Sequence, residues 1–274
     1  MPANESTGSM YSLQAMLSRI DRDKARIDSH RPLPKHTAAS LREHLALEWT
    51  YNSNGIEGNT LTLRETKVVL EGITVGGKTM REHLEAINHR DAIEFLEMLV
   101  AEPTPISERD IKDLHALVLR GIDSDEAGRY RRENVRITGA STTPPDFLHV
   151  EEAIQRLLSW THSQTGYHPV RHIAELHTRF VEIHPFIDGN GRTGRLLMNC
   201  ELMKAGYPPS IIRVNERLDY YDALDTACTT GDYDAIARLV GQGVERSMAA
   251  YLELLEPPQP NPSCQPPLPK GRGG

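Results

Sequence analysis

Apolar residues recur at helical spacing along most of this chain, and this pattern restricts the fold more than any other feature. Leu41, Leu45 and Trp49 repeat every four residues on a stretch that runs toward Gly58, a glycine suited to end a helix. Helical spacing recurs in four later sets: Met80, Leu84, Ile87, Leu96 and Leu99; Ile111, Leu114 and Val118; Val150, Ile154 and Leu157; and Ile173, Leu176, Phe180 and Ile183. Leu196 and Leu197 open a further helix, which Gly206 and the Pro208–Pro209 pair end. Because such helices must bury their apolar stripes against one another, the sequence predicts an all-α bundle.

Polar residues mark the starts of some of these helices. Thr62, followed three residues later by Glu65, has the form of a capping box. Ser107 followed by Asp110 has the same form and predicts another helix start. One or two more helices are expected between about residues 216 and 255.

The stretch "ENVRITGASTTPPDF", residues 133 to 147, is the exception to the helical pattern. Four of its residues alternate as in a strand: Val135, Arg136, Ile137 and Thr138. Gly139 is suited to turn the chain back, which predicts one small β-hairpin beside the helices. A hairpin of this size is marginally stable by itself.

Composition divides the chain and excludes several classes of protein. We expect an N-terminal segment at 1–33, an N-terminal helical region at 34–104, a main helical core at 105–255 and a proline-rich disordered tail at 256–274. No apolar run approaches the roughly 20 residues of a membrane span, and "MPANESTGSM" lacks the basic and apolar regions of a signal peptide. Three cysteines without metal-type spacing indicate reduced thiols. A net charge of −7 argues against nucleic-acid binding, so the expected partner is a protein or a small molecule.

The stretch "HPFIDGNGRTGR" contains more polar and flexible residues than a turn between two helices requires. Gly189, Asn190 and Gly191 can point successive backbone N–H groups inward, which makes an anion nest at the positive end of the next helix. Arg192 and Arg195 are three residues apart and therefore share a helix face. Two guanidinium groups over a glycine nest are suited to a polyphosphate.

Two further side chains of this stretch add chemistry. Asp188 would be repelled by phosphate unless a divalent cation lay between them, and Mg²⁺ commonly combines a carboxylate with phosphate oxygens. His184 is the one group of the stretch that can accept a proton near neutral pH. Together these residues indicate transfer of part of a nucleotide to a hydroxyl nucleophile.

A zinc site built from His168, His172, His177 and His184 is an alternative. A two-histidine site on a helix needs a spacing of four residues. His172 and His177 are five apart, so their side chains diverge by about 140° around a helix. His168 precedes a proline and is expected outside the helix, so zinc binding is disfavoured.

The same stretch resembles the signature of the Fic (filamentation induced by cAMP) family, HPFx(D/E)GNGRxxR, at every specified position from His184 to Arg195. The similarity extends from about residue 40 to about residue 252 and includes "MKAGYPPSIIR" and "DYY". It implies a Fic core of helices with a β-hairpin flap, and transfer of AMP from ATP to a hydroxyl side chain of a target protein. With no membrane anchor or repeat region, the chain looks like a compact bacterial member in the cytoplasm.

The resemblance also implies a role for each matching residue. His184 is the general base that deprotonates the target hydroxyl, and Asp188 holds Mg²⁺ against the α- and β-phosphates. The remaining residues bind the phosphates, with Arg195 on the γ-phosphate: Gly189, Asn190, Gly191, Arg192 and Arg195. Family members that phosphorylate carry a lysine at the second glycine and lack the last arginine, so this sequence favours AMP transfer.

A second motif, "SNGIEGN", resembles the inhibitory motif (S/T)xxxE(G/N) of the same family, with Ser53 and Glu57 at its specified positions. A glutamate at the end of a helix can reach across and pair with Arg195, which is then unavailable to the γ-phosphate. The region 34–104 would then hold an inhibitory helix, and 105–255 the Fic core. A capped helix end is the alternative interpretation.

Three further expectations follow from the resemblance. The hairpin at Val135–Thr138 matches the family's flap, which binds an extended target segment by strand addition. Tyr220 and Tyr221 can pack against the base, but Cys228 stands where an animal relative has an asparagine that contacts adenine. Cysteine is a weak hydrogen-bond partner, so the identity of the nucleotide stays open. Whether the chain forms a homodimer also stays open.

The sequence therefore predicts an autoinhibited, Mg²⁺-dependent protein adenylyltransferase that modifies Ser, Thr or Tyr of a target and also itself. The enzymatic alternative is removal of AMP from a modified protein, alone or beside AMP transfer, with Glu57 orienting a water. The alternative of another class is a non-catalytic module that binds ATP and senses its level.

Overall fold

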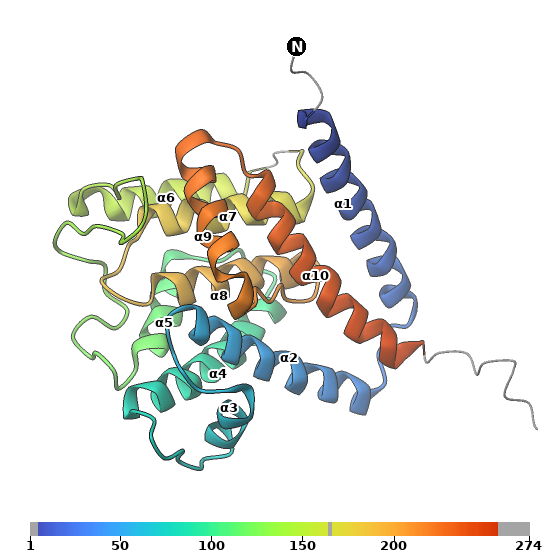
Figure 1. The fold of residues 1–274 in the computed structure, drawn as a ribbon, viewed down its shortest axis with the longest axis horizontal. Helices are drawn as coiled ribbons and strands as arrows, with labels where there is room; N and C mark the ends of the chain where they lie inside the picture. The colour runs from blue at the N-terminus through green and yellow to red at the C-terminus, as the bar shows by residue number, and fades with distance from the viewer. Residues whose placement is uncertain (1–4, 164–165, 257–274) are drawn as a thin grey trace, which may run out of the picture.

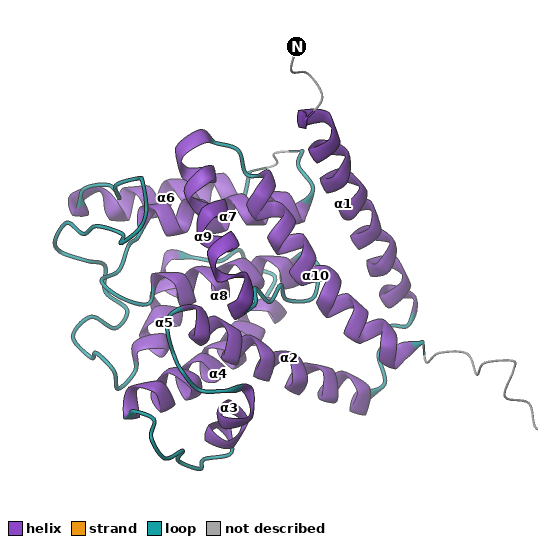
Figure 2. Ribbon diagram, viewed as in Figure 1, coloured by secondary structure: helices purple, strands orange, loops and turns teal. Residues whose placement is uncertain are grey.

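The computed structural model describes residues 5–163 and 166–256 (Figure 1). This part of the chain is helical and contains no strand (Figure 2). Its α-helices are α1 (Glu5–Ser29), α2 (Lys35–Ile56), α3 (Leu63–Leu70), α4 (Met80–Ala101), α5 (Glu108–Leu119), α6 (Val150–Thr161), α7 (Pro169–Ile183), α8 (Asn190–Lys204), α9 (Arg217–Thr230) and α10 (Asp234–Leu255). Two short 3-10 helices are η1 (Phe147–His149) and η2 (Val214–Glu216). The predicted all-α class is confirmed for the described residues.

The predicted helix starts are confirmed by their hydrogen bonds. At α3, the Glu65 N–H donates to Thr62 Oγ1 (3.2 Å) and the Thr62 N–H donates to Glu65 Oε2 (2.7 Å). Ser107 and Asp110 form the same reciprocal pair at α5. A third capping box, at Thr79 before α4, was not predicted. Reciprocal caps satisfy backbone N–H groups that a helix end otherwise leaves unpaired.

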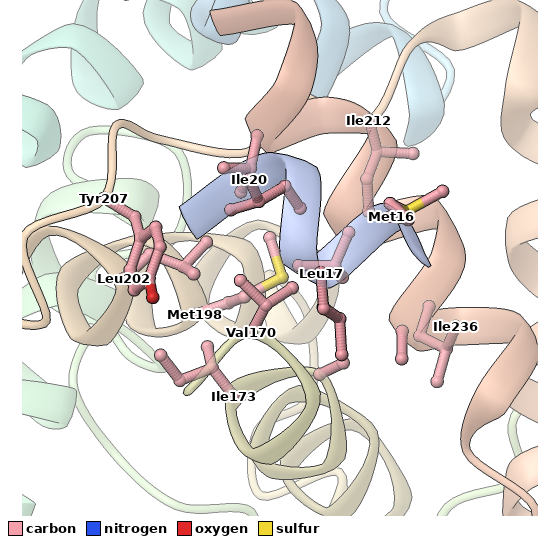
Figure 3. Close-up of a cluster of buried hydrophobic side chains, with 14 of the residues drawn as sticks. Met16, Leu17, Ile20, Val170, Ile173, Met198, Leu202, Tyr207, Ile212 and Ile236 are labelled. Atoms are coloured by element: carbon pink, nitrogen blue, oxygen red, sulfur yellow. The ribbon is translucent and has the colours of Figure 1, made fainter. Parts of the chain in front are cut away.

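The N-terminal helix α1 lies along α10 at one side of the bundle (Figure 1). Met16, Leu17 and Ile20 are buried on its inner face, against side chains of α7 and α8 such as Ile173 and Met198 (Figure 3). A helix in this stretch was not predicted from the sequence. Its burial makes α1 part of the bundle's first hydrophobic cluster.

Helix α8 lies between the two main hydrophobic clusters, near the middle of the bundle in Figure 1. Met198 and Leu202 pack into the first cluster with α1 and α10. Leu196 and Leu197 pack into the second cluster with α4 and α5. Because α8 is buried on opposite sides, the position of its N-terminus is set by the packing of the whole bundle.

The hairpin expected at residues 133–147 is not formed, and this expectation was wrong for the described structure. The residues from Val135 to Thr138 belong to no strand, and one turn bond, from the Ala140 N–H to the Ile137 carbonyl (3.2 Å), remains. The returning arm contains Pro144 and Pro145, which have no N–H to donate to a ladder. We call residues 133–147 the flap segment below.

The proline-rich tail expected at 256–274 lies, after Glu256, outside the described residues. Between residues 5 and 256, leaving aside the undescribed pair 164–165, no helix has both the length and the apolar character needed to cross a bilayer.

Candidate active site

The loop between α7 and α8 reverses the chain through two left-handed residues. His184 caps the C-terminus of α7 with φ 49° and ψ 60°, and Gly189 caps the N-terminus of α8 with φ 77°. Helix α8 begins at Asn190, earlier than the Leu196–Leu197 pair that marked it in the sequence. Arg192 and the nearby glycines therefore lie in the first turns of a helix, where free N–H groups and the helix dipole attract an anion.

Asn190 holds the loop closed with both ends of its side-chain amide. Its Oδ1 accepts from the Phe186 N–H (2.9 Å) and its Nδ2 donates to the Phe186 carbonyl (2.8 Å). The side chain is only 3% exposed. The phosphate contact expected of Asn190 is therefore left to its backbone N–H.

His115 of α5 supports the same loop, and the sequence analysis missed it. The Gly128 N–H donates to His115 Nδ1 (2.9 Å), so the ring proton is on Nε2, which donates to the Asp188 carbonyl (2.9 Å). The imidazole stacks on the Phe186 ring, with centroids 3.6 Å apart. Burial lowers the pKa of His115 to about 4, so the ring is neutral near pH 7.

Arg131 joins this loop to the flap segment and was also missed. Its guanidinium is 2% exposed and donates to the carbonyls of His184 (2.9 Å), Glu133 (3.0 Å) and Pro145 (2.5 Å). In the sequence Arg131 stands beside Arg132, which lies at the surface, and no local pattern distinguishes the two.

His184 lines a cavity of about 310 Å³ together with Glu57, Gly191 and Arg195. Burial lowers the pKa of its imidazole below the ordinary value, and the nearby carboxylates of Glu57 and Asp188 oppose that shift only in part. The ring is therefore neutral near pH 7 and can accept a proton. A neutral histidine in a cavity is suited to act as a general base.

The predicted pairing of Glu57 with Arg195 is confirmed. Arg195 Nη2 donates to Glu57 Oε1 (2.7 Å) and to the Ser53 carbonyl (2.8 Å), and Arg195 Nε donates to Ser53 Oγ (3.1 Å). Arg195 is 2% exposed. Burial alone would lower its pKa, but the charge of Glu57 raises it on balance, so the guanidinium stays protonated.

The same carboxylate lies directly over the glycine nest at the start of α8. A Cβ atom added to Gly191 would be 2.2 Å from Glu57 Oε1. A side chain at this position would therefore displace the Glu57 carboxylate from its place beside Arg195. Glu57 thus occupies the space in which backbone N–H groups and Arg195 are arranged to bind an anion.

Asp188 lies in a network of ion pairs at the edge of the nest. Its Oδ1 accepts from the Gly189 N–H (2.6 Å) and from Arg192 Nη2 (3.1 Å), and its Oδ2 accepts from Arg81 of α4. Glu85, also on α4, pairs with Arg192 Nη1 (3.2 Å). Burial alone would raise the pKa of Asp188, but Arg192, the Gly189 N–H and Arg81 together lower it, so Asp188 stays ionised.

The residues present fit a Mg²⁺–nucleotide pair. The Asp188 side chain is 45% exposed and is a single hard oxygen ligand, as Mg²⁺ commonly takes from a protein when phosphates complete its coordination. Arg192 Nε is buried and has no hydrogen-bond partner among the described residues. Within the same residues, no three His, Cys, Asp or Glu side chains form a group that could hold a metal ion. Most ligands of such an ion would have to come from the nucleotide.

Two comparisons with known proteins decide the family. The model of the Fic/DOC family matches residues 105–202. A solved structure of Fic-1 from C. elegans, its residues 134–508, matches with a TM-score of 0.79 and 31% identity, over 90% of this chain and 73% of that one. This chain belongs to the Fic/DOC family.

Two further relatives also match most of this chain. "Protein adenylyltransferase Fic" of Drosophila yakuba is 38% identical over 242 residues, which are 88% of this chain and 48% of that protein. The chain thus spans about half the length of the curated relatives it matches. A Fic-domain signalling protein from Bacteroides thetaiotaomicron matches with a TM-score of 0.77 and 27% identity, over 85% of this chain and 95% of that one. The curated relatives are fly proteins and do not support the bacterial origin expected from the sequence.

The adjacent residues Tyr220 and Tyr221, which were expected to pack against the base, have different environments. Tyr220 is 1% exposed, and its hydroxyl hydrogen-bonds His177 Nε2 (2.7 Å) beneath Arg195. Tyr221 is 38% exposed and donates to the last carbonyl of α2 (3.2 Å). Tyr220 therefore supports the arginine from below, while Tyr221 presents more of its ring to the cavity that both residues line.

Cys228 and part of the flap segment complete the Fic cavity. Burial raises the pKa of the Cys228 thiol to about 11, so it is protonated near pH 7. Ile137 and Thr138 line the cavity from the flap side. Val135 and Ile137 are half-buried while Arg136 and Thr138 are exposed, so the predicted alternation is present without a strand.

A detectable signal marks two of the helices that support the site, α4 and α2, although it does not find His115 or Arg131. Polar residues occupy the inner face of α4 at helical spacing, where Glu85, Asn88 and His89 would be apolar in an ordinary core helix. Buried Asn52, Ser53 and Asn54 at the end of α2 show the same feature. A polar stripe on a buried helix face indicates a site packed against it.

Proposed function

We propose that this chain is an autoinhibited protein adenylyltransferase, which transfers AMP from ATP to a Ser, Thr or Tyr hydroxyl of a target protein and to its own hydroxyls. One observation carries the proposal: the Glu57 carboxylate lies over Gly191 and pairs with Arg195, in a cavity that His184 lines. The nest is suited to bind an anionic substrate, and the carboxylate that fills it is suited to keep that substrate out. The name of the Drosophila relatives supports the same activity.

The residues present supply a complete reaction. The phosphates of ATP lie along the N-terminus of α8, bound by backbone N–H groups, Arg192 and Arg195. The target hydroxyl oxygen forms a bond to the α-phosphorus while His184 takes its proton. The bond from that phosphorus to the bridging oxygen breaks, and pyrophosphate leaves with the electron pair. Mg²⁺ bound at Asp188 would offset the negative charge of the phosphates.

The flap segment is the proposed docking site for the target. Among the described residues, Val135–Thr138 make one backbone hydrogen bond, the one accepted by the Ile137 carbonyl. The other N–H and C=O groups can pair with an extended target segment by strand addition. Arg131 connects the flap segment to the backbone of His184, so a docked strand is held next to the base.

The test is the change Glu57→Gly, assayed with ATP labelled at the α- or γ-phosphate. If the buried ion pair is worth roughly 2–5 kcal/mol, removing it raises AMP transfer by tens of fold to about a few thousand. Arg195→Ala should cancel the gain in the double variant, because both changes act through one phosphate contact. Glu71→Gly is the matched control, since Glu71 also follows the last residue of a helix and precedes a glycine but pairs only with Lys67.

The outcomes separate the proposal from its alternatives. Label from the α-phosphate, absent with His184→Ala, supports adenylyl transfer. Label from the γ-phosphate alone would indicate a kinase. No label from either position with Glu57→Gly would leave a module that only binds ATP. A Glu57→Gly variant no more active than Glu71→Gly would mean that "SNGIEGN" is only a helix end.

Removal of AMP is the second candidate, favoured by one feature of Glu57. Its Oε1 is used by Arg195, whereas Oε2 makes no hydrogen bond or ion pair in the described structure, and the side chain is 31% exposed. A carboxylate oxygen that lines the same cavity as His184 can orient a water toward a bound phosphate ester. Release of AMP from a modified target by the wild type, lost in Glu57→Gly, would establish this activity.

A further inference from the structure

The flap segment is tied at its two ends and at one point near its turn. At the ends, Arg131 donates to the carbonyls of Glu133 and Pro145, and Asn134 Nδ2 donates to Asp146 Oδ2 (2.9 Å). Near the turn, Ser141 makes two hydrogen bonds to α9, and the neighbouring Thr142 hydrogen-bonds the thiol of Cys228 on the same helix. The position of the turn therefore depends on contacts with one helix, and the contact of Ser141 is the stronger because its acceptor is charged.

That contact is made by Asp225 of α9 with two hydrogen bonds. The Ser141 N–H donates to Asp225 Oδ1 (2.6 Å), and Ser141 Oγ donates to Oδ2 (2.8 Å). Cys228 lies three residues further on the same face of α9, and Thr142 lies beside its thiol. Two consecutive residues of the flap segment thus meet two residues of one helix face.

The contact closes one side of the cavity that His184 lines. Gly139, Ala140 and Thr142 line the cavity from the flap segment, and Asp225 and Cys228 line it from the adjoining face of α9. If the carboxylate released Ser141, the turn would lose its two hydrogen bonds to Asp225 while the ends stayed bound. The wall of the cavity and the docking residues Val135–Thr138 would then move together, because they lie on the same short segment.

We propose that Asp225 is a positioning residue: it clamps the flap segment to α9 and so sets the docking strand in register with His184. This inference rests on the proposed adenylyl transfer for its kinetic effect, but the clamp itself is a structural property. Asp225 acts through Ser141 and touches neither reacting group. Its effect therefore falls on the binding of the target more than on the chemical step.

The experiment compares Asp225→Ala, Asp225→Asn and Ser141→Ala in the Glu57→Gly background. Loss of two exposed hydrogen bonds should raise the KM for a protein target by about 5- to 20-fold with Asp225→Ala, with kcat changed by less than about 3-fold. Asp225→Asn keeps an acceptor for the Ser141 N–H and should recover most of the KM. Ser141→Ala keeps the N–H donor and should have a smaller effect than Asp225→Ala.

Hydrogen exchange of the backbone amides supplies a readout that needs no activity. Asp225→Ala should increase exchange at the Ser141 amide, whose N–H donates to Asp225, and at the Ala140 amide of the adjoining turn, and leave the amides of α8 unchanged. Asp222→Asn is the control, because Asp222 is an exposed carboxylate on the same helix that makes no hydrogen bond or ion pair among the described residues.

Each outcome decides the proposal. Unchanged exchange and unchanged target KM in Asp225→Ala would overturn it, and an equal effect of Asp222→Asn would show that only nearby charge matters. A loss confined to kcat would also overturn it. If no variant transfers AMP but exchange at Ala140 and residue 141 rises only with Asp225→Ala and Ser141→Ala, the clamp stands and the proposed function fails.

Discussion

The α7–α8 loop and the flap segment are both irregular connections beside His184, but they are held in different ways. Buried side chains bind the backbone of the first: Asn190 holds Phe186, His115 holds the Asp188 carbonyl, and Arg131 holds His184. The turn of the second is held by Asp225, a surface carboxylate that contacts Ser141. Buried bonds are costly to break, whereas exposed ones exchange with water at little cost.

This difference matches the two tasks of the proposed enzyme. Groups that meet the phosphates and the reacting hydroxyl must keep their geometry, because small displacements reduce transfer strongly. A segment that pairs with a target must leave its backbone groups free until the target arrives. Substitutions in the first region should therefore change chemistry or stability, and substitutions in the second should change target binding.

The largest expected effect is in the α7–α8 loop. His184→Ala in the Glu57→Gly background should reduce AMP transfer by about 100- to 10,000-fold, the usual range for loss of a general base. The melting temperature should stay near that of the parent, because His184 lies in a loop outside the hydrophobic clusters. Transfer of radiolabelled AMP measures the activity, and a thermal melt measures the stability. Labelling close to that of the parent would mean that His184 is not the general base.

The next effect tests the residue that joins the two regions. Arg131→Ala leaves three carbonyls without their buried donor and should destabilise the fold by roughly 2–4 kcal/mol, with reduced transfer. Arg132→Ala is the matched control: that side chain is 70% exposed and pairs with Glu126, so urea unfolding should not change. Equal midpoints for the two variants would mean that the regions are not joined through Arg131.

A smaller effect is expected at the edge of the nest. Asp188→Asn removes a ligand charge and should raise the Mg²⁺ concentration for half-maximal activity by about 10-fold or more. Arg81→Ala should lower it by about 2- to 5-fold, because it removes a cation that pairs with the same carboxylate at the surface. Titration with Mn²⁺ and ATP, followed by electron paramagnetic resonance, measures binding separately. If both variants shifted the required Mg²⁺ concentration in the same direction, Arg81 and Mg²⁺ would not compete for the Asp188 carboxylate.

The smallest effect is a shift in pH dependence. Burial lowers the pKa of His184, so the imidazole stays neutral, and able to accept a proton, to a lower pH than an ordinary histidine of pKa about 6.5. The acid limb of kcat/KM should therefore have its midpoint below 6.5. It should lie lower still in Glu57→Gly, since the Glu57 charge opposes the shift. A midpoint above 6.5 would contradict the neutral base.

Much of this molecule could be predicted from residues near each other in the chain. Apolar spacing placed most of the helices, although not α1, and Thr62 and Ser107 marked two of their starts, because helix hydrogen bonds and caps are local. The motif around Gly191 predicted an anion nest for the same reason. The Glu57–Arg195 contact joins distant residues, and only the family resemblance made it predictable.

Tertiary structure decided which polar side chains support that motif and whether the flap segment pairs. Arg131 and Arg132 are neighbours with the same chemistry, and only the packing of the bundle buries one and exposes the other. The alternation from Val135 to Thr138 matches the burial of these residues, but the strand predicted from it is absent, because a strand also needs a partner with free N–H groups. The returning arm contains Pro144 and Pro145, which have no N–H groups for such pairing. Hydrogen bonds between distant segments depend on where the whole chain places their donors, and no local pattern contains that information.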